Sequence, residues 1–343
     1  MQHVLIDYLA SRVPTSDGVQ LTLFRSPPRG PRRLDRPSAN PVVLIPGAGA
    51  NRYTFGLGPE RSLPAVLNAH GRDVWLAELR GSKSSRGVAP ISLCLKLSED
   101  LPAILAHVRA ATGATEVDLV GHSLGGLLAL LLSATDEHIG RVVTVSAPGT
   151  LRGFVPDHPL VHGLARGVEA LAGRLGKIAI APWAKVPGPI PHLVSFQKHF
   201  GYDALDMADR RRYLDHCVED MPGGDLAQLA RWVREGVISD RHGRSLEPLF
   251  ANVRSQILAL SSAHDKIIPT VMVEAGIAKL VAADVTHLRL GKAHGQRRDY
   301  AHADVFLAAD AVADVLEPIA RWLDAASDVR TTPRSGASAG RRR

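Results

Sequence analysis

The chain has 343 residues, of which 45% are hydrophobic and 22% are charged, an ordinary composition for a soluble globular protein. Its formal net charge of +7 comes from two segments, because the Pro-rich stretch 25–36 and the last seventeen residues, 327–343, each carry +4 and the remainder is nearly neutral. This distribution argues against a nucleic-acid-binding surface on the folded part and favours a disordered, solubilising tail; contact of the tail with an acidic lipid surface or a nucleic acid is the alternative.

The first half of the chain predicts strands and helices in alternation. Two strands are expected within Val13–Leu23, joined through the turn at Asp17-Gly18. The apolar strand Val42–Ile45 follows and ends in the small-residue loop Pro46–Asn51. Three more elements are expected before residue 114. They are a helix at 59–70, a buried strand at 74–77 and a second helix at 98–112 with Ser98 as its N-cap.

The most informative stretch is an apolar run from Val117 to Leu132 that is interrupted by Gly121-His122-Ser123-Leu124-Gly125. It predicts a buried strand, an abrupt turn and a buried helix, with the Ser123 hydroxyl at the apex. Side chains at Gly121 or Gly125 would clash with the neighbouring elements. The turn lies at the carboxyl end of a strand, where open α/β sheets bind ligands, and it resembles the nucleophile elbow of the α/β-hydrolases.

The alternation lapses near Gly149 and resumes with a strand at Gln256–Leu260. A parallel sheet with helices on both faces explains the alternating parts, and an insertion explains the gap. The sequence therefore predicts four parts in chain order. Residues 1–149 form the first part of the core, 150–248 an inserted helical cap or lid, 249–326 the second part of the core and 327–343 a disordered basic tail.

The predicted insertion holds seven of the sixteen aromatic residues in less than a third of the chain: Phe154, Trp183, Phe196, Phe200, Tyr202, Tyr213 and Trp232. A small helical subdomain needs a core of its own, which is one explanation. The other is that some of these rings line an apolar acyl pocket beneath a lid. The two explanations are compatible.

A serine nucleophile needs a base, normally a histidine that a buried carboxylate orients. In the α/β-hydrolases that the elbow resembles, the acid and then the histidine follow the serine in loops after later strands. Asp265 follows the strand that ends near Ser261 and is the expected acid; a turn or helix cap is its alternative function. Asp240 and Asp284 are poorer candidates, since neither follows the carboxyl end of a sheet strand.

Two histidines follow the strand Val285–Leu290 and qualify as the base by position, His294 and His302. We expect His302, because it directly precedes the apolar stretch Val305–Leu307, where the loop returns to the sheet. His122 is expected to support or pack the site, since neighbouring side chains in a tight turn point apart.

The negative charge that develops on a substrate carbonyl oxygen needs fixed N–H donors, each worth about 3 kcal/mol in the transition state. The backbone N–H of Leu124 is one expected donor of this oxyanion hole. The other is that of Ala48, because the loop after the strand Val42–Ile45 has small residues that permit close backbone approach.

The elbow, Asp265 and His302 in this order make the chain resemble an α/β-hydrolase from about Val13 to Ala325. Within that superfamily, Asp73–Ser82 and Tyr300–Asp304 are similar to the acid lipases and to the polyhydroxyalkanoate synthase and depolymerase relatives. Two departures stand out. Many lipases have His-Gly where this chain has Pro46-Gly47, and the synthases carry Cys in the elbow. Ser123 also disfavours the superfamily members with an Asp nucleophile.

The resemblance implies a serine esterase or lipase-like hydrolase that acts on a small-molecule or lipid ester through Ser123, Asp265 and His302. The same triad would serve an acyltransferase, and a non-catalytic binding protein on a hydrolase scaffold is a third possibility. No cofactor, metal, nucleic acid or transmembrane segment is expected, and the oligomeric state is left open. Because no secretory signal is evident and the two cysteines, Cys94 and Cys217, are far apart, we expect a cytoplasmic protein.

Overall fold

The computed structural model describes residues 8–28, 39–86, 90–155, 158–179 and 205–325. Several predictions fall outside these ranges. They concern the basic tail 327–343, most of the basic stretch 25–36, the Pro-rich part of the insertion around 182–191 and four of its aromatic residues: Trp183, Phe196, Phe200 and Tyr202.

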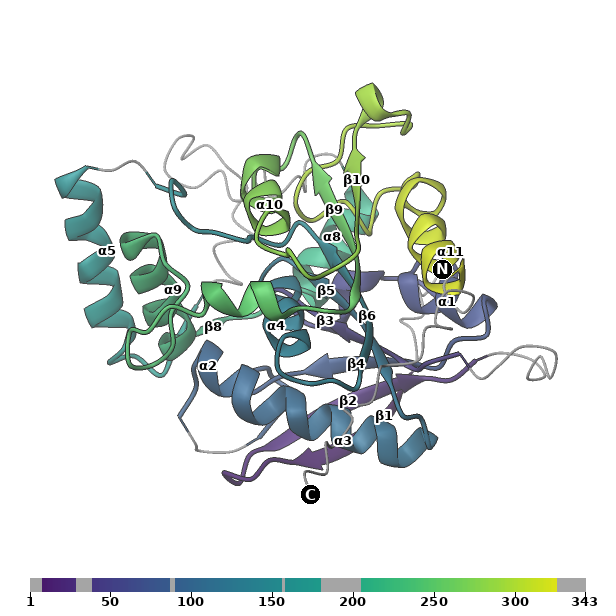
Figure 1. Cartoon of the computed structure of the whole chain (residues 1–343), viewed down its shortest axis with the longest axis horizontal. Coiled ribbons are helices and arrows are strands. Elements are labelled where there is room, and N and C mark those ends of the chain that lie inside the picture. Colours follow the sequence, from purple (N-terminus) through teal and green to yellow (C-terminus); the bar gives the residue numbers. More distant parts are fainter. Residues whose placement is uncertain (1–7, 29–38, 87–89, 156–157, 180–204, 326–343) are drawn as a thin grey trace, which may run out of the picture.

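One eight-stranded sheet forms the centre of the molecule, in the order β1-β2-β4-β3-β5-β6-β9-β10 (Figure 1). β2 runs antiparallel to both of its neighbours, and the six strands from β4 to β10 in this order are parallel. The mostly parallel α/β sheet that the sequence predicts is therefore confirmed. The strands are β1 (Leu9–Pro14), β2 (Gln20–Ser26), β3 (Val42–Ile45), β4 (Val74–Glu78), β5 (Val117–His122), β6 (Ile139–Val145), β9 (Gln256–Ser262) and β10 (Val285–Leu290).

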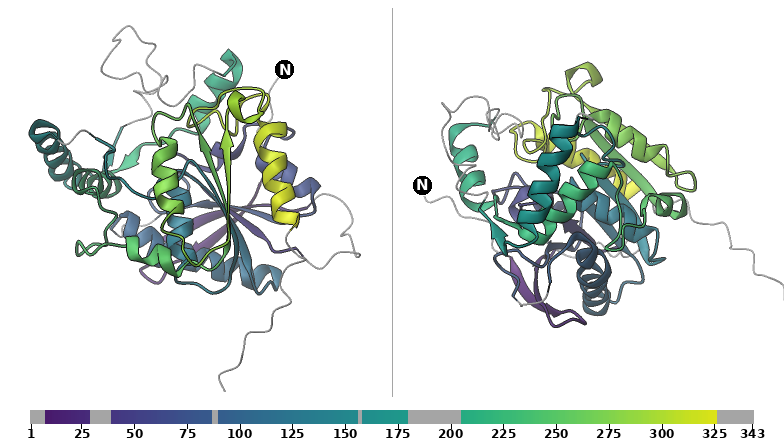
Figure 2. Two further views of the ribbon diagram at one scale, coloured as in Figure 1. Left: turned by 45° about the horizontal axis from the view of Figure 1, so that its top comes forward. Right: turned by 90° about the vertical axis from the view of Figure 1, so that its left-hand side faces the viewer.

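Helices cover both faces of this sheet (Figure 2). The sheet thus divides the apolar core into two clusters, one on each face. Successive strand side chains point to opposite faces, so Val43 and Ile45 of β3 belong to one apolar cluster and Val42 and Leu44 to the other. The first cluster is closed by α3 (Leu101–Thr112), α4 (Leu124–Ser133) and α10 (Thr270–Ile277). The second is closed by α1 (Leu63–Ala69) and α11 (Glu317–Asp324).

The helix that leads into α3 begins earlier than the sequence predicts. Ser92 is its N-cap, with Oγ accepting a hydrogen bond from the backbone N–H of Leu95 at 3.2 Å, and α2 (Leu93–Leu95) continues through a π-helical stretch, Lys96–Asp100, into α3. The prediction that Ser98 caps this helix was wrong, because Ser92 supplies the same local cap upstream. The predicted end is confirmed: Gly113 follows the last turn with a φ of 72°.

The strand β5, the turn at Ser123 and α4 form the predicted strand–turn–helix unit. A Cβ at Gly121 would lie 2.5 Å from the backbone of Gly125 and Gly126, and a Cβ at Gly125 would lie 2.2 Å from the carbonyl oxygen of Ile45. These are backbone atoms that have no room to move. The steric need for glycine on both sides of Ser123 is confirmed.

Between β6 and β9 the described chain adds no strand to the main sheet. Its elements are α5 (Pro159–Ala172), β7 (Lys177–Ile178), α8 (Met207–His216), β8 (Met221–Pro222), α9 (Gly223–Glu235) and a 3-10 turn, Glu247–Asn252. The short strands β7 and β8 pair with each other, and α5 packs on α9 at the left edge of Figure 1. This part of the chain meets the core where α9 contacts α2 and where α8 contacts the 3-10 turn Arg52–Phe55.

None of the helices in the described ranges is long and apolar enough to span a lipid bilayer.

Candidate active site

Ser123 lies between β5 and α4 in a backbone conformation that is rare for a residue with a side chain. Its φ is 53° and its ψ is −122°. Such a conformation costs about 1–3 kcal/mol and persists where the surrounding structure enforces it. Two neighbouring segments hold Ser123 in this conformation. On β6, the carbonyl of Val145 accepts a hydrogen bond from the Ser123 N–H at 2.8 Å. In the loop after β3, Gly47 lies so close that a Cβ there would be 3.1 Å from Cβ of Ser123. The sheet thus holds this hydroxyl-bearing residue at the carboxyl end of β5.

Asp265 and His302 form a buried hydrogen bond. Nδ1 of His302 donates to Oδ2 of Asp265 at 2.8 Å, and the two side chains are 3% and 0% exposed. The other carboxylate oxygen accepts from the backbone N–H groups of Ile267 and Ile268, at 2.9 and 2.8 Å. Because a carboxylate only accepts, the proton of His302 lies on Nδ1, and Nε2 is left as the ring's basic nitrogen.

Asp265 is held in its charged form. Burial alone would raise its pKa, but the charge and hydrogen bond of His302, the Ile268 N–H and the Ser146 hydroxyl outweigh burial and lower the pKa below its ordinary value. Ser146 was missed by the sequence analysis. It directly follows β6, has a φ of 51° and is buried. Its position after the strand next to β5 is the only signal that could have singled it out.

A cavity of about 260 Å³ brings the predicted site residues together. Ser123, His302, Ala48 and Leu124 all line it, and Asp265 lies buried behind His302. The remaining wall is mostly apolar and includes Leu127, Leu151, Phe154, Tyr213, Leu229 and Trp232. The three described aromatic residues of the insertion therefore all line this cavity.

The alternative acids and bases lie elsewhere. His294 is exposed in a short 3-10 turn, Lys292–His294. Asp240 binds the side chain of Arg244, and Asp284 accepts from the side chain of Gln256 at the start of β9. Of the candidates considered from the sequence, only Asp265 and His302 are paired with each other.

His122 packs behind His302 as an uncharged ring. Its Nε2 donates to the backbone carbonyl of His302 at 2.9 Å, and the two ring centroids are 4.8 Å apart. Burial, followed by the charge of His302, lowers the pKa of His122 from its ordinary value of 6.5 to about 3. The expected supporting function of His122 agrees with these contacts.

The low pKa of His122 makes folding sensitive to acid. The unfolded chain binds a proton at this histidine below about pH 6.5 and the folded chain does not until about pH 3, so the free energy of unfolding falls as the pH decreases through this window. Between pH 7 and 4.5 the loss from this group is roughly 3 kcal/mol. His122→Gln keeps an N–H donor for the His302 carbonyl. Between pH 7 and 4.5, we expect the free energy of unfolding of this variant, measured with urea, to fall by roughly 3 kcal/mol less than that of the wild type. Equal losses in the two proteins would contradict the assignment.

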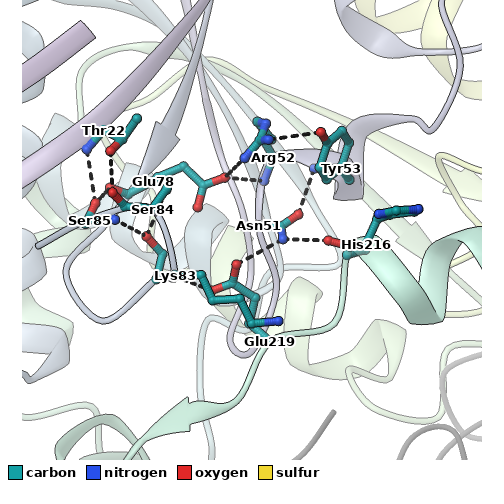
Figure 3. Close-up of polar contacts among 12 residues, drawn as sticks. Thr22, Asn51, Arg52, Tyr53, Glu78, Lys83, Ser84, Ser85, His216 and Glu219 are labelled. Carbon is teal, nitrogen blue, oxygen red and sulfur yellow. Dashed lines mark hydrogen bonds and ion pairs between the residues drawn. The ribbon is translucent and has the colours of Figure 1, made fainter. Parts of the chain in front are cut away.

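The loop Pro46–Asn51 after β3 is held by contacts that the sequence analysis did not identify (Figure 3). The Asn51 side chain donates to the carbonyl of His216 at 2.7 Å and to Oε1 of Glu219 at 3.0 Å. The neighbouring Glu78 carboxyl accepts from the backbone and the guanidinium of Arg52, at 3.2 and 2.9 Å. Because the partners of Asn51 lie at the end of α8 and just after it, far away in the sequence, no local pattern reveals them.

The order of strands and the position of the strand–turn–helix unit can now be compared with known proteins. A family model described as the alpha/beta hydrolase fold matches residues 40–179, which include β3 to β6 and the turn at Ser123. A thermophilic esterase from Thermogutta terrifontis has a structure similar over 92% of this chain and 98% of its own, with a TM-score of 0.59 and 17% sequence identity. The chain has the α/β-hydrolase fold.

Two of the sequences similar to this chain are those of lipases. The triacylglycerol lipase of Burkholderia plantarii is 30% identical over 138 residues, which are 40% of this chain and 37% of the lipase. The triacylglycerol lipase of Pseudarthrobacter phenanthrenivorans is 34% identical over 110 residues, 32% of this chain and 33% of the lipase. The chain thus spans about a third of the length of the curated relatives that it matches. The recognised resemblance to lipase- and esterase-like α/β-hydrolases is confirmed.

Proposed function

We propose that the protein is a serine hydrolase that cleaves carboxylic esters with a lipophilic acyl group. The observation that carries this proposal is the buried 2.8 Å hydrogen bond between Asp265 and His302, on the wall of an apolar cavity that Ser123 also lines. The names of the two similar lipases support an ester as the substrate. In this proposal residues 150–248 are the lid, because they supply Leu151, Phe154, Tyr213, Leu229 and Trp232 to the cavity wall.

The reaction begins when Oγ of Ser123 attacks the ester carbonyl carbon and Nε2 of His302 accepts the hydroxyl proton. Asp265 stabilises the resulting imidazolium, and the backbone N–H groups of Ala48 and Leu124 donate to the oxyanion. The tetrahedral intermediate collapses as His302 gives the proton to the leaving alkoxide, which departs as the alcohol. Water, deprotonated by His302, then attacks the acyl-enzyme carbonyl. As this second tetrahedral intermediate collapses, His302 returns the proton to Oγ of Ser123 and the carboxylic acid is released.

The direct test is an ester series together with an active-site probe. The purified protein should hydrolyse p-nitrophenyl esters from acetate to laurate, and a fluorophosphonate probe should label it at Ser123. Adding an acceptor alcohol should leave the free acid as the main product; a predominant new ester would instead identify an acyltransferase. Absence of both hydrolysis and labelling would contradict the proposal and favour a binding protein.

Acyl-chain preference should depend on Leu229 of α9, which is partly buried and lines the cavity. In Leu229→Trp the larger side chain takes up part of the space that a long acyl chain needs. We expect kcat/KM to fall about 10- to 100-fold for the longest esters that the wild type accepts and to change little for acetate, since each lost methylene contact costs about 1–3 kcal/mol. The control Leu229→Met preserves the volume. An equal fall for all chain lengths would show that Leu229 does not set acyl length.

A further inference from the structure

The loop that carries Ala48 lines two cavities. Gly47, Ala48, Gly49 and Ala50 line the 260 Å³ cavity that Ser123 also lines, and the same four residues line a second cavity of about 40 Å³. Four acidic residues are also part of the lining of the second cavity: Glu78, Glu219, Asp220 and Asp225. Residues that contact this loop can therefore control where its N–H groups lie.

The loop has almost no side chains with which to fix its own position. Gly47-Ala48-Gly49-Ala50 is permissive in conformation, and Gly49 has a φ of 62°. Small residues allow the backbone to approach the substrate, but they leave the position of the Ala48 N–H to contacts from other segments. An error of 1 Å in such a donor can cost about 100-fold in rate.

Those contacts come mainly from residues 216–219, the last residue of α8 and the three that follow it. The N–H of Glu219 donates to the carbonyl of Gly49 at 2.8 Å, and Ala50 and Val218 form an antiparallel bridge. The Glu219 side chain adds a second connection, because its Oε1 accepts from Asn51 at 3.0 Å. The Asn51 side-chain oxygen in turn accepts from the backbone N–H of Tyr53 at 3.0 Å (Figure 3). The Asn51 amide group therefore connects Glu219 to the backbone of the 3-10 turn after the loop.

The other oxygen of Glu219 reaches a third segment. Oε2 accepts from the backbone N–H of Lys83 at 3.0 Å, in the loop after β4. The Glu219 carboxyl group therefore bridges the loop after β3, the loop after β4 and its own segment, and the residue is only 4% exposed. A buried carboxyl group that is shared by three backbone segments restricts all of them at once.

We propose that Glu219 is a positioning residue for the oxyanion hole. It acts through Asn51 and the Gly49 carbonyl to hold the Ala48 N–H where the oxyanion forms. The inference rests on the proposed ester hydrolysis, and it makes the oxyanion hole depend on the same inserted segment that lines the acyl cavity.

Glu219→Ala removes the bridge at the side chain and leaves the backbone contact to Gly49 in place. We expect kcat to fall about 10- to 100-fold, with KM changed less than threefold, because a displaced oxyanion donor weakens the transition state more than substrate binding. A trifluoromethyl ketone, which forms a tetrahedral adduct, should lose affinity by the same factor as kcat/KM. Asn51→Ala should have a similar effect, and the double variant should lose no more than the worse single variant.

Two further variants separate positioning from general destabilisation. Glu219→Gln keeps the shape and an acceptor for Asn51 but places an NH2 group against the Lys83 N–H, so kcat should lie between those of Glu219→Ala and the wild type. Glu235→Ala removes an exposed glutamate of the same segment, at the end of α9, and should leave kcat unchanged. All assays are run well below each variant's melting temperature, which circular dichroism measures.

The inference would be overturned if folded Glu219→Ala kept the wild-type kcat, or if its ketone affinity stayed unchanged while its hydrolysis fell. Failure of the proposed function is a different result, because the wild type itself would then neither hydrolyse esters nor react with the fluorophosphonate probe.

Discussion

Ser123→Ala is expected to lower kcat for p-nitrophenyl ester hydrolysis by about 10⁵- to 10⁶-fold and to abolish fluorophosphonate labelling. Loss of a serine nucleophile removes the acyl-enzyme route, and only oxyanion stabilisation and binding remain. The variant should fold as the wild type does, because alanine is no bulkier than serine in the strained turn.

The control for this substitution is Ser245→Ala. Ser245 is exposed in the loop that precedes the 3-10 turn Glu247–Asn252, and it does not line the cavity. Its loss should leave kcat unchanged. Ser123→Ala protein that retained more than about a hundredth of the wild-type activity would exclude Ser123 as the nucleophile.

Asp265→Asn is expected to lower kcat by about 10⁴-fold at neutral pH with little change in KM. An amide at this position no longer stabilises the imidazolium, and it can hold His302 in the wrong tautomer by donating to Nδ1. The carboxylate now accepts from His302, Ile267 and Ile268, so the substitution also replaces an acceptor with a donor in a buried site.

Asp240→Asn is the matched control for Asp265→Asn, because Asp240 lies between β6 and β9, pairs with Arg244 and does not line the cavity. We expect it to keep the wild-type kcat. A similar loss in both variants, or retention of activity in Asp265→Asn, would contradict the assignment of Asp265 as the acid. Steady-state kinetics over a range of pH would measure both effects.

The parts of the site that follow from strand ends could be predicted from the sequence. Each of Ser123, Asp265 and His302 follows a strand of the parallel part of the sheet, and parallel strands bring the segments after their carboxyl ends to one edge. The glycines beside Ser123 were predicted for the same reason, since a sharp turn between two buried elements leaves no space for a Cβ. Patterns of this kind are local, and a single sequence displays them.

The supporting residues could not be predicted because their function arises from contacts between distant segments. Ser146 is an ordinary serine until β6 places it beside Asp265, and Glu219 is an ordinary glutamate until the chain returns after α8 to the loop after β3. The error at Ser98 has a related cause. Two serines of this segment can serve as an N-cap; Ser92 caps the helix, and Ser98 lies within the π-helical stretch that follows.

The antiparallel bridge between Ala50 and Val218 has a consequence for protein engineering. Exchanging residues 150–248, the proposed lid, for the corresponding segment of a protein with the same fold would be the obvious way to obtain a new acyl preference. Such a chimera would also replace the segment His216–Glu219, which contacts the loop after β3, and turnover would fall even with a well-formed new pocket. A transplant that exchanges about residues 150–215 and 220–248 would instead keep His216–Glu219 from the host. It would replace most of the apolar cavity wall, Leu229 included, so selectivity would be exchanged separately from turnover.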